Sequence, residues 1–183
     1  LSSVFRSQLP QIDKVEFGVE AQSLGETTNP ILITQSEYMR RMKEMANIQA
    51  GMNFYGEMPD MFNLIVNVDH RLVKEVLNDS EKECENVLTP IEQEIQALQK
   101  RHKELHKLQE GKKTEEIPTV EKDELNEIEK KIADRKSKKE AILGEYASKN
   151  KMVRQLVDLA LLQNNMLKGE ALNNFIKRSL DLI

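Results

Sequence analysis

The stretch that decides the fold lies near the end of the chain, at Met152–Leu162, and reads MVRQLVDLALL. Its apolar residues cover much of the circumference of a helix, which indicates a helix packed on more than one side. Asn164 and Asn165 end this helix, and a second helix begins at Gly169. The second helix has apolar residues of its own, which are Ala171, Leu172, Phe175, Ile176, Leu180, Leu182 and Ile183.

These two helices, within residues 152–183, carry more apolar surface than they can bury against each other. A small sheet would cover part of it. The same helices of a second copy would cover it more fully, as a four-helix bundle with two-fold symmetry. The pattern therefore favours an obligate homodimer. The residues that we expect in its interface are Leu156, Leu159, Leu162, Leu172, Phe175, Ile176 and Leu180.

The first part of the chain predicts a small sheet. Val15–Ala21 alternates apolar and polar residues, as a half-buried strand does, and Ile31–Ile33 reads as a second short strand. We expect these two to pair as a hairpin with a long connection. Phe62–Asn67 is the third strand, followed by a helix over His70–Leu77 that Asp69 is placed to cap. Strands followed by a helical remainder indicate an α+β fold, mostly helical, with a three-stranded sheet.

The middle of the chain, residues 85–149, predicts a helical hairpin resembling a coiled coil. Two apolar series at spacings of three and four flank the segment 111–119, which is rich in charges and helix breakers. Each arm would hold about 24 residues, or ~36 Å of helix, and its thin apolar seam suggests that it projects from the body. The series are Cys84, Leu88, Ile91, Ile95, Leu98, Leu105 and Leu108, and then Leu125, Ile128, Ile132, Ile142 and Tyr146.

The composition argues against several classes of protein. The chain has 183 residues and a net charge of −4 with both signs mixed, so we expect no basic face for nucleic acid. No run of about 18 apolar residues is present, so we expect no membrane span. The single Cys84 can form no internal disulfide and fits a reducing compartment. We expect the protein to be cytoplasmic. The start at Leu1 rather than Met suggests a fragment.

The sequence offers no catalytic, cofactor-binding or metal-binding residues that we can assign. It has no phosphate loop, no nucleophile elbow and no dinucleotide-binding turn. His102 and His106 are four residues apart, a spacing that could bind a metal on one face of a helix. No carboxylate or thiolate in register along the chain completes a ligand set, so we expect both to be solvated. We therefore predict that the chain is not an enzyme.

One segment carries a signal for binding. Six of the eight methionines fall within Gln35–Met61. Methionine is flexible and polarisable, so a methionine-rich face suits contacts with varied apolar partners. The alternative is an ordinary core stripe, which the spacing alone favours. On a helix from Gln35 to about Gln49, the residues that share this face are Tyr38, Met39, Met42, Met45, Ala46 and Gln49.

Three separated blocks resemble one known family. The runs Gln155–Leu162 and Leu167–Arg178 strongly resemble the end of the bacterial HtpG chaperones, the bacterial branch of the 90-kDa heat-shock family. Tyr38–Lys43 and Leu64–His70 resemble the same family in the same order. The resemblance covers about residues 15–70 and 152–183.

The resemblance implies that residues 1–183 are the C-terminal domain of an ATP-dependent chaperone that assists protein folding under stress. In that family the last two helices hold two protomers together, and an amphipathic helix touches unfolded client proteins. The client-contact residues would here be Tyr38, Met39, Met42 and Met45. ATP and Mg²⁺ would bind in domains of the parent protein that this chain lacks, and the chain itself would need no cofactor.

The segment 85–149 departs from the family and reads as a charged insertion. An alternative function follows from it. The chain could be a structural coiled-coil adaptor, in which this hairpin binds the main partner and residues 152–183 anchor it.

Overall fold

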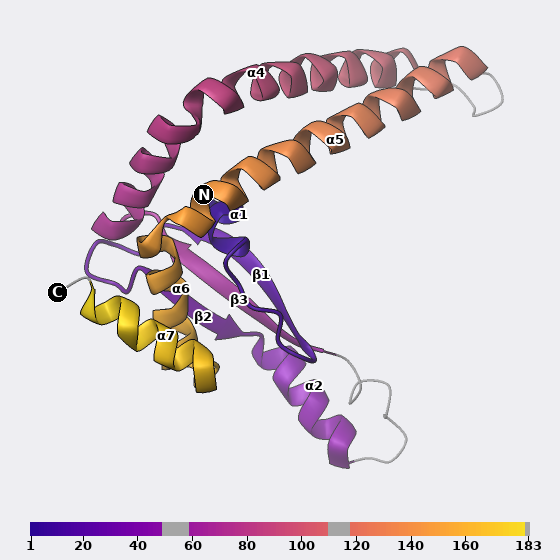
Figure 1. Cartoon of the computed structure of the whole chain (residues 1–183). Coiled ribbons are helices and arrows are strands. Elements are labelled where there is room, and N and C mark those ends of the chain that lie inside the picture. Colours follow the sequence, from indigo (N-terminus) through magenta and orange to yellow (C-terminus); the bar gives the residue numbers. More distant parts are fainter. Residues whose placement is uncertain (49–58, 110–117, 182–183) are drawn as a thin grey trace.

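The computed structural model of the chain describes residues 1–48, 59–109 and 118–181 (Figure 1). The fold is α+β and mostly helical, with one small three-stranded sheet, as the sequence predicts. The predictions that concern Gln49, Met52, Met58, the breaker-rich residues 111–117 and the last two residues lie outside the described residues.

The sheet consists of β1 (Val15–Gln22), β2 (Ile31–Gln35) and β3 (Asp60–Asn67). β3 lies in the centre, with β1 parallel to it on one side and β2 antiparallel on the other. The predicted hairpin is therefore wrong, because β3 separates β1 from β2. Alternating apolar residues indicate which face of a strand is buried, but they do not identify its neighbour. β3 lies in the interior of the sheet, and its Leu64 and Val66 are fully buried.

The connection from β1 to β2 is held by Asn67, the last residue of β3, which is fully buried. Its side-chain nitrogen donates to the carbonyl oxygens of Gly25 (2.8 Å), Thr28 (3.3 Å) and Asn29 (3.4 Å). Its side-chain oxygen accepts the backbone N–H of Leu24 at 3.2 Å. A buried amide with these partners satisfies loop groups that would otherwise lack hydrogen bonds.

The long helix α4 spans Arg71–Gln109 without a break. The sequence predicts a helix ending at Leu77 and a separate arm from Cys84. That division is wrong, because the polar residues between them continue the helix. Ser80 in this segment is buried, and its hydroxyl donates to the carbonyl of Leu77 at 2.8 Å. Pro90 lies inside the helix, where it removes one backbone hydrogen bond. Proline commonly kinks helices, and α4 bends along its length (Figure 1).

Asp69 does not cap α4, contrary to the prediction. Its carboxylate accepts the hydroxyl of Ser23 (2.6 Å) and the backbone N–H of Gly25 (2.8 Å). These hydrogen bonds hold the pKa of Asp69 below its ordinary value. At the start of the helix, His70 instead accepts the N–H of Leu72 through its ring Nδ1 at 3.2 Å.

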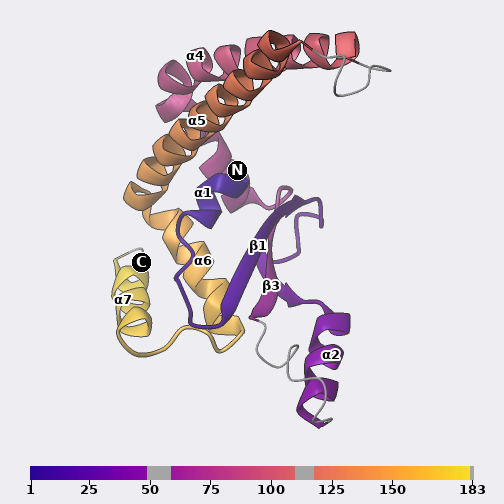
Figure 2. The same ribbon diagram turned by 90° about the vertical axis from the view of Figure 1, so that its right-hand side faces the viewer.

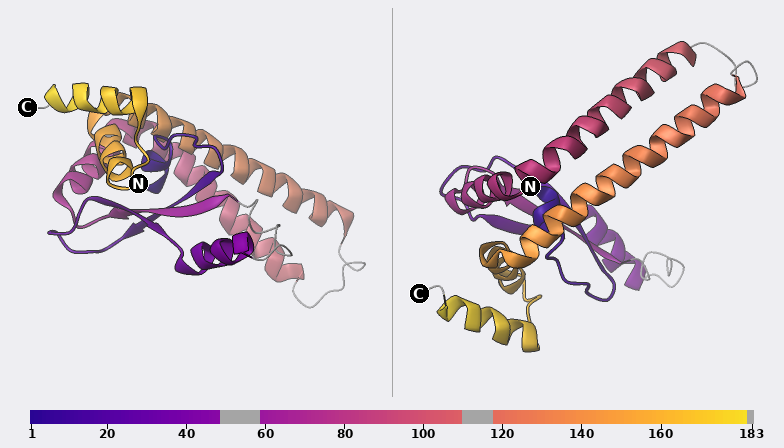
Figure 3. Two further views of the ribbon diagram at one scale, coloured as in Figure 1. Left: turned by 90° about the horizontal axis from the view of Figure 1, so that it is seen from below. Right: turned by 45° about the horizontal axis from the view of Figure 1, so that its top comes forward.

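α5 spans Thr119–Lys149 and lies antiparallel beside the outer part of α4, so the two form the predicted hairpin (Figures 1 and 3). The arms are longer than predicted and extend away from the sheet. Ile95, Leu105 and Ile128 are buried in the seam between them.

Ion pairs across the seam supplement this thin apolar contact. Arg101 contacts Glu124 at 2.9 Å between Nε and Oε1. Arg135 and Lys139 occur where the apolar series on α5 is interrupted. They pair with Glu94 and Glu92 on the facing arm.

The core lies between the inner face of the sheet and α6 (Lys151–Gln163), with the short helix α1 (Ser2–Arg6) beside them (Figure 2). α6 begins at Asn150, whose side-chain oxygen accepts the N–H groups of Met152 (2.9 Å) and Val153 (3.2 Å). This is an N-cap, and it separates α6 from the preceding α5. The residues of α6 buried in the core are Val153, Leu156, Val157, Ala160 and Leu161.

α7 (Gly169–Leu180) lies on the outside of α6 (Figures 2 and 3). Its Leu172 and Phe175 pack against the core, but no residue of this helix is fully buried. The connection from α6 turns at Asn165 and Gly169, which both have positive φ angles. Among the described helices, none is both long enough and apolar enough to span a bilayer.

Candidate interaction surfaces

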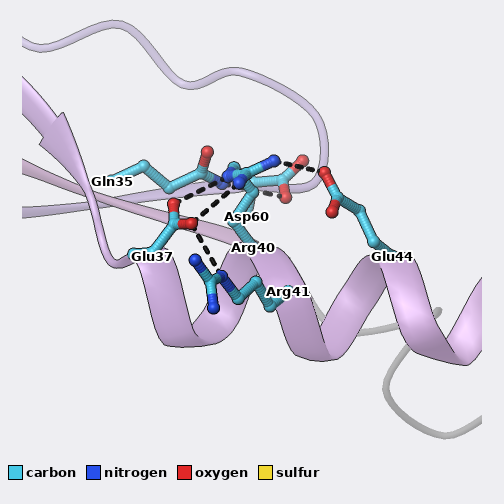
Figure 4. Close-up of polar contacts among 6 residues, drawn as sticks. All are labelled: Gln35, Glu37, Arg40, Arg41, Glu44 and Asp60. Carbon is cyan, nitrogen blue, oxygen red and sulfur yellow. Dashed lines mark hydrogen bonds and ion pairs between the residues drawn. The ribbon is translucent and has the colours of Figure 1, made fainter.

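The helix α2 (Glu37–Ile48) is amphipathic, and ion pairs stabilise its charged face (Figure 4). The carboxylate of Glu37 accepts hydrogen bonds from Arg40 (2.8 Å) and Arg41 (2.8 Å). Arg40 also pairs with Glu44, one turn further along. The hydrogen bonds from Arg40 and Arg41 lower the pKa of Glu37 to about 2. Charged pairs three and four residues apart stabilise a helix that has few tertiary contacts.

The opposite face of α2 carries the predicted client-contact residues. Tyr38 is 68% exposed and Met45 is 48% exposed, whereas Met39 and Met42 are half-buried. The described residues that form the hydrophobic core include none from α2. The helix extends beyond the end of the sheet, next to β3 (Figure 1). Tyr38 and Met45 therefore do not belong to a core stripe, which was the alternative that the spacing favoured.

The predicted dimer helices differ in how far the chain itself covers them. Leu156 is only 4% exposed and packs in the core of the single chain, so it adds little surface for a partner. Leu162, Leu172 and Phe175 are half-buried against that core. The remaining residues of the predicted interface are exposed, at 37% for Leu159, 47% for Ile176 and 68% for Leu180. We call these three the exposed apolar residues of α6 and α7.

Polar contacts fasten α7 to α6. Arg178 is ion-paired with Asp158, and Gln155 donates to the hydroxyl of Ser179. Burial raises the pKa of Asp158, while the positive charge of Arg178 opposes that shift. No spacing pattern in the sequence predicts this pair. The signal for it was an aspartate among the apolar residues of α6, where an unpaired charge would be costly.

The two histidines of α4 have a neighbour that lies far from them in the sequence. The carboxylate of Glu129, on α5, lies 3.1 Å from the ring Nε2 of His102. His106 lies beside His102, with the ring centroids 4.6 Å apart. The prediction considered only groups in register with the two histidines, whereas Glu129 comes from the facing arm and not from the same helix.

Comparison with known proteins gives one consistent result. The Chaperone protein htpG of Bacteroides fragilis strain YCH46 is 67% identical over all 183 residues. The HtpG chaperones of Bacteroides thetaiotaomicron and of Porphyromonas gingivalis strain ATCC 33277 are 62% and 42% identical, over 183 and 185 residues. The relatives of this chain are HtpG chaperones. In each case the match covers 100% of this chain and 27% of the relative.

The chain therefore spans about a quarter of the length of these relatives. The aligned region includes α4 and α5, so these relatives carry a corresponding segment where this chain has its helical hairpin. No family model matches the chain. No solved structure matches it either.

Proposed function

We propose that this chain is the dimerisation and client-contact domain of an HtpG-type molecular chaperone and performs no catalysis itself. The observation that carries the proposal is the exposed face of α2. Tyr38 and Met45 present apolar surface to solvent, although the helix could have packed them inward. The similarity to HtpG chaperones supports the same reading.

Client contact on α2 would use the adaptability of methionine. The ion pairs of Glu37 and Arg40 stabilise the helix on its charged face. The helix therefore does not need to bury its apolar face against the rest of the chain to remain folded. Flexible thioether side chains can fit apolar segments of different shapes, as an unfolded protein presents them. Burying one such side chain contributes about 1–2 kcal/mol, so several weak contacts would give reversible binding.

Dimerisation would use α6 and α7. Leu159, Ile176 and Leu180 are exposed in the single chain, and a second copy would cover them. Pairing of α6 and α7 with their counterparts would form a four-helix bundle with two-fold symmetry. In this arrangement Leu162, Leu172 and Phe175 would lose their remaining exposure.

We also propose an activity for the longer protein of which this chain would be a part. The parent chaperone would bind ATP and Mg²⁺ in regions outside this chain and would act in the cytoplasm on unfolded or partly folded proteins. Residues 85–149 would be an insertion between the two parts that contact clients and partner.

Client contact can be tested with a fluorescently labelled protein that has been reduced and carboxymethylated so that it stays unfolded. We expect Tyr38→Asp and Met45→Asp each to weaken its binding by about 5- to 10-fold, because each removes ~1 kcal/mol of apolar contact. The matched control is Val87→Asp, which changes a 51% exposed apolar residue on α4. Fluorescence anisotropy measures the affinity. Equal affinities for all three variants and the unmodified chain would refute client contact at α2.

Dimerisation can be tested by light scattering at micromolar concentration. We expect the unmodified chain to be a dimer, and the double variant Ile176→Asp/Leu180→Asp to be a folded monomer. The control is Leu108→Asp/Val120→Asp, which places the same charges at exposed apolar positions of the hairpin. Replacement of the outer part of the hairpin, residues 94–136, by a short linker should leave the dimer intact, because it keeps the core residues Leu143, Tyr146 and Ala147. If that deletion abolished the dimer, the coiled-coil adaptor would be the better reading.

A further inference from the structure

Two histidines and one glutamate come together across the arms of the hairpin. His102 and His106 are one turn apart on α4, and Glu129 is on α5. One ligand atom from each residue can be chosen so that all three lie within 4.8 Å of one another. The Nε2 atom of His102 and the Oε1 atom of Glu129 are already 3.1 Å apart. From this geometry we propose a binding site for a divalent transition-metal ion, of which Zn²⁺ is the best example.

The donor set fits this class of ion. Imidazole nitrogen is a ligand for zinc, copper, iron and nickel, and a carboxylate oxygen adds one negative charge to the set. Ca²⁺ and Mg²⁺ prefer sets made only of oxygen atoms, so two imidazoles select against them. Three protein ligands leave a fourth tetrahedral position, which a water molecule can fill.

The spacing of the ligand atoms requires only small movements of side chains. Zinc–ligand bonds of about 2.0–2.2 Å place two tetrahedral ligands ~3.4 Å apart. The pair of His102 and Glu129, with its atoms 3.1 Å apart, is close to this spacing. His106 is exposed, so its ring can rotate toward the other two without disturbing packed neighbours.

The surroundings make the site more rigid than an ordinary surface cluster. Leu105 lies between the two histidines in sequence and is 2% exposed, and Ile128, next to Glu129, is 6% exposed. These buried neighbours fix the backbones that carry the ligands. Lys103 and Lys136 line the same hollow as His102 and Glu129. Their positive charges oppose the binding of a cation, so affinity must come from direct coordination and not from a general negative field.

A metal ion here would link α4 to α5 near the outer part of the hairpin. The arms are otherwise joined by a thin apolar seam and by ion pairs such as that of Arg101 with Glu124. Coordination stabilises the state in which the ligands are assembled. The site therefore acts as a metal-dependent clamp that keeps the two arms together.

The test uses the 183-residue chain without an affinity tag, because tag histidines would bind the same ions. Calorimetric titration with Zn²⁺ should give one ion per chain. Titration with Co²⁺ should give the visible absorption of a tetrahedral site. We expect His106→Ala and Glu129→Gln each to weaken Zn²⁺ binding by about 10-fold or more, since each removes a ligand. Zn²⁺ should also raise the melting temperature of the unmodified chain more than that of either variant.

Three controls separate this site from unspecific binding. Glu127→Gln changes a carboxylate one half-turn away on α5, which pairs with Lys131. His70→Asn changes the third histidine of the chain, at the start of α4. Cys84→Ser removes the one thiol, which is buried. All three should bind Zn²⁺ as the unmodified chain does. Failure of the chain to bind Zn²⁺ and Co²⁺, or unchanged binding in both His106→Ala and Glu129→Gln, would overturn the proposal.

Discussion

The guanidinium of Arg178, on α7, is ion-paired with the carboxylate of Asp158, on α6, and their side chains are only 20% and 10% exposed. Asp158 lies among the apolar residues that α6 turns toward the core, where a charge without a partner would be costly. The pair therefore fixes where α7 can lie on α6. Because α7 carries Ile176 and Leu180, the same pair also positions two of the exposed apolar residues.

Removing one member of this pair should destabilise the chain. We expect Arg178→Met to lower the free energy of unfolding by about 2–3 kcal/mol, since it leaves the carboxylate of Asp158 largely buried and unpaired. The double variant Asp158→Leu/Arg178→Met should regain most of the loss, because both charges are then gone. Urea unfolding followed by circular dichroism measures both. Equal instability of the single and double variants would contradict this account of the pair.

Asn67 provides a second test, at the connection between β1 and β2. Asn67→Ala should lower the free energy of unfolding by about 2–3 kcal/mol, because the carbonyl of Gly25 and the N–H of Leu24 lose their buried partner. Asn67→Asp should be at least as harmful, since a carboxylate would face the same carbonyl oxygen. The control Asn63→Ala changes an exposed asparagine of the same strand. A result in which Asn63→Ala costs as much as Asn67→Ala would refute the special role of Asn67.

Tyr146 gives a prediction for alkaline pH. Its hydroxyl donates to the carbonyl of Val76 (3.3 Å) and accepts from the side chain of Asn150 (2.8 Å). Burial, with a smaller contribution from the charge of Asp79, raises the pKa of Tyr146 to about 12. Between about pH 10 and 12 the native state thus keeps a proton that the unfolded chain loses, so the free energy of unfolding falls as the pH rises.

Tyr146→Phe isolates this effect. We expect the substitution to cost about 1 kcal/mol at neutral pH, through the lost hydrogen bonds, and to reduce the fall in stability above pH 10. Urea unfolding at several pH values measures the difference between the two proteins. If both proteins lost stability equally above pH 10, Tyr146 would not be the group responsible.

Much of the fold follows from the sequence because it depends on local periodicity. The apolar residues of the strand β3 and of the helix α6 follow patterns that predict which of their residues are buried. The order of the strands does not follow from the sequence, because a run such as Val15–Ala21 alternates in the same way beside any neighbour. The prediction that Asp69 caps α4 is wrong for a similar reason. An aspartate before a helix suits an N-cap, but the competing donors Ser23 and Gly25 are more than forty residues away in sequence.

Among the candidate sites, too, residues on one helix could be predicted from the sequence, and contacts between helices could not. The face of Tyr38 and Met45 could be found from spacing, since all its members lie on one helix. The exposure of that face could not be predicted from spacing, because it depends on what the rest of the chain packs against the helix. Glu129 and Arg178 each act on a residue of another helix, so no spacing along the chain points to them.

During translation β1 and β2 are synthesised before β3, the strand with which both of them pair. Until residue 67 has left the exit tunnel, these two segments have no partner, and their hydrogen-bonding edges are open to other chains. The inner face of the sheet stays uncovered by α6 until that helix is synthesised, and α6 follows both α4 and α5 in the chain. A nascent chain of this protein therefore completes its core only after α6 has been synthesised.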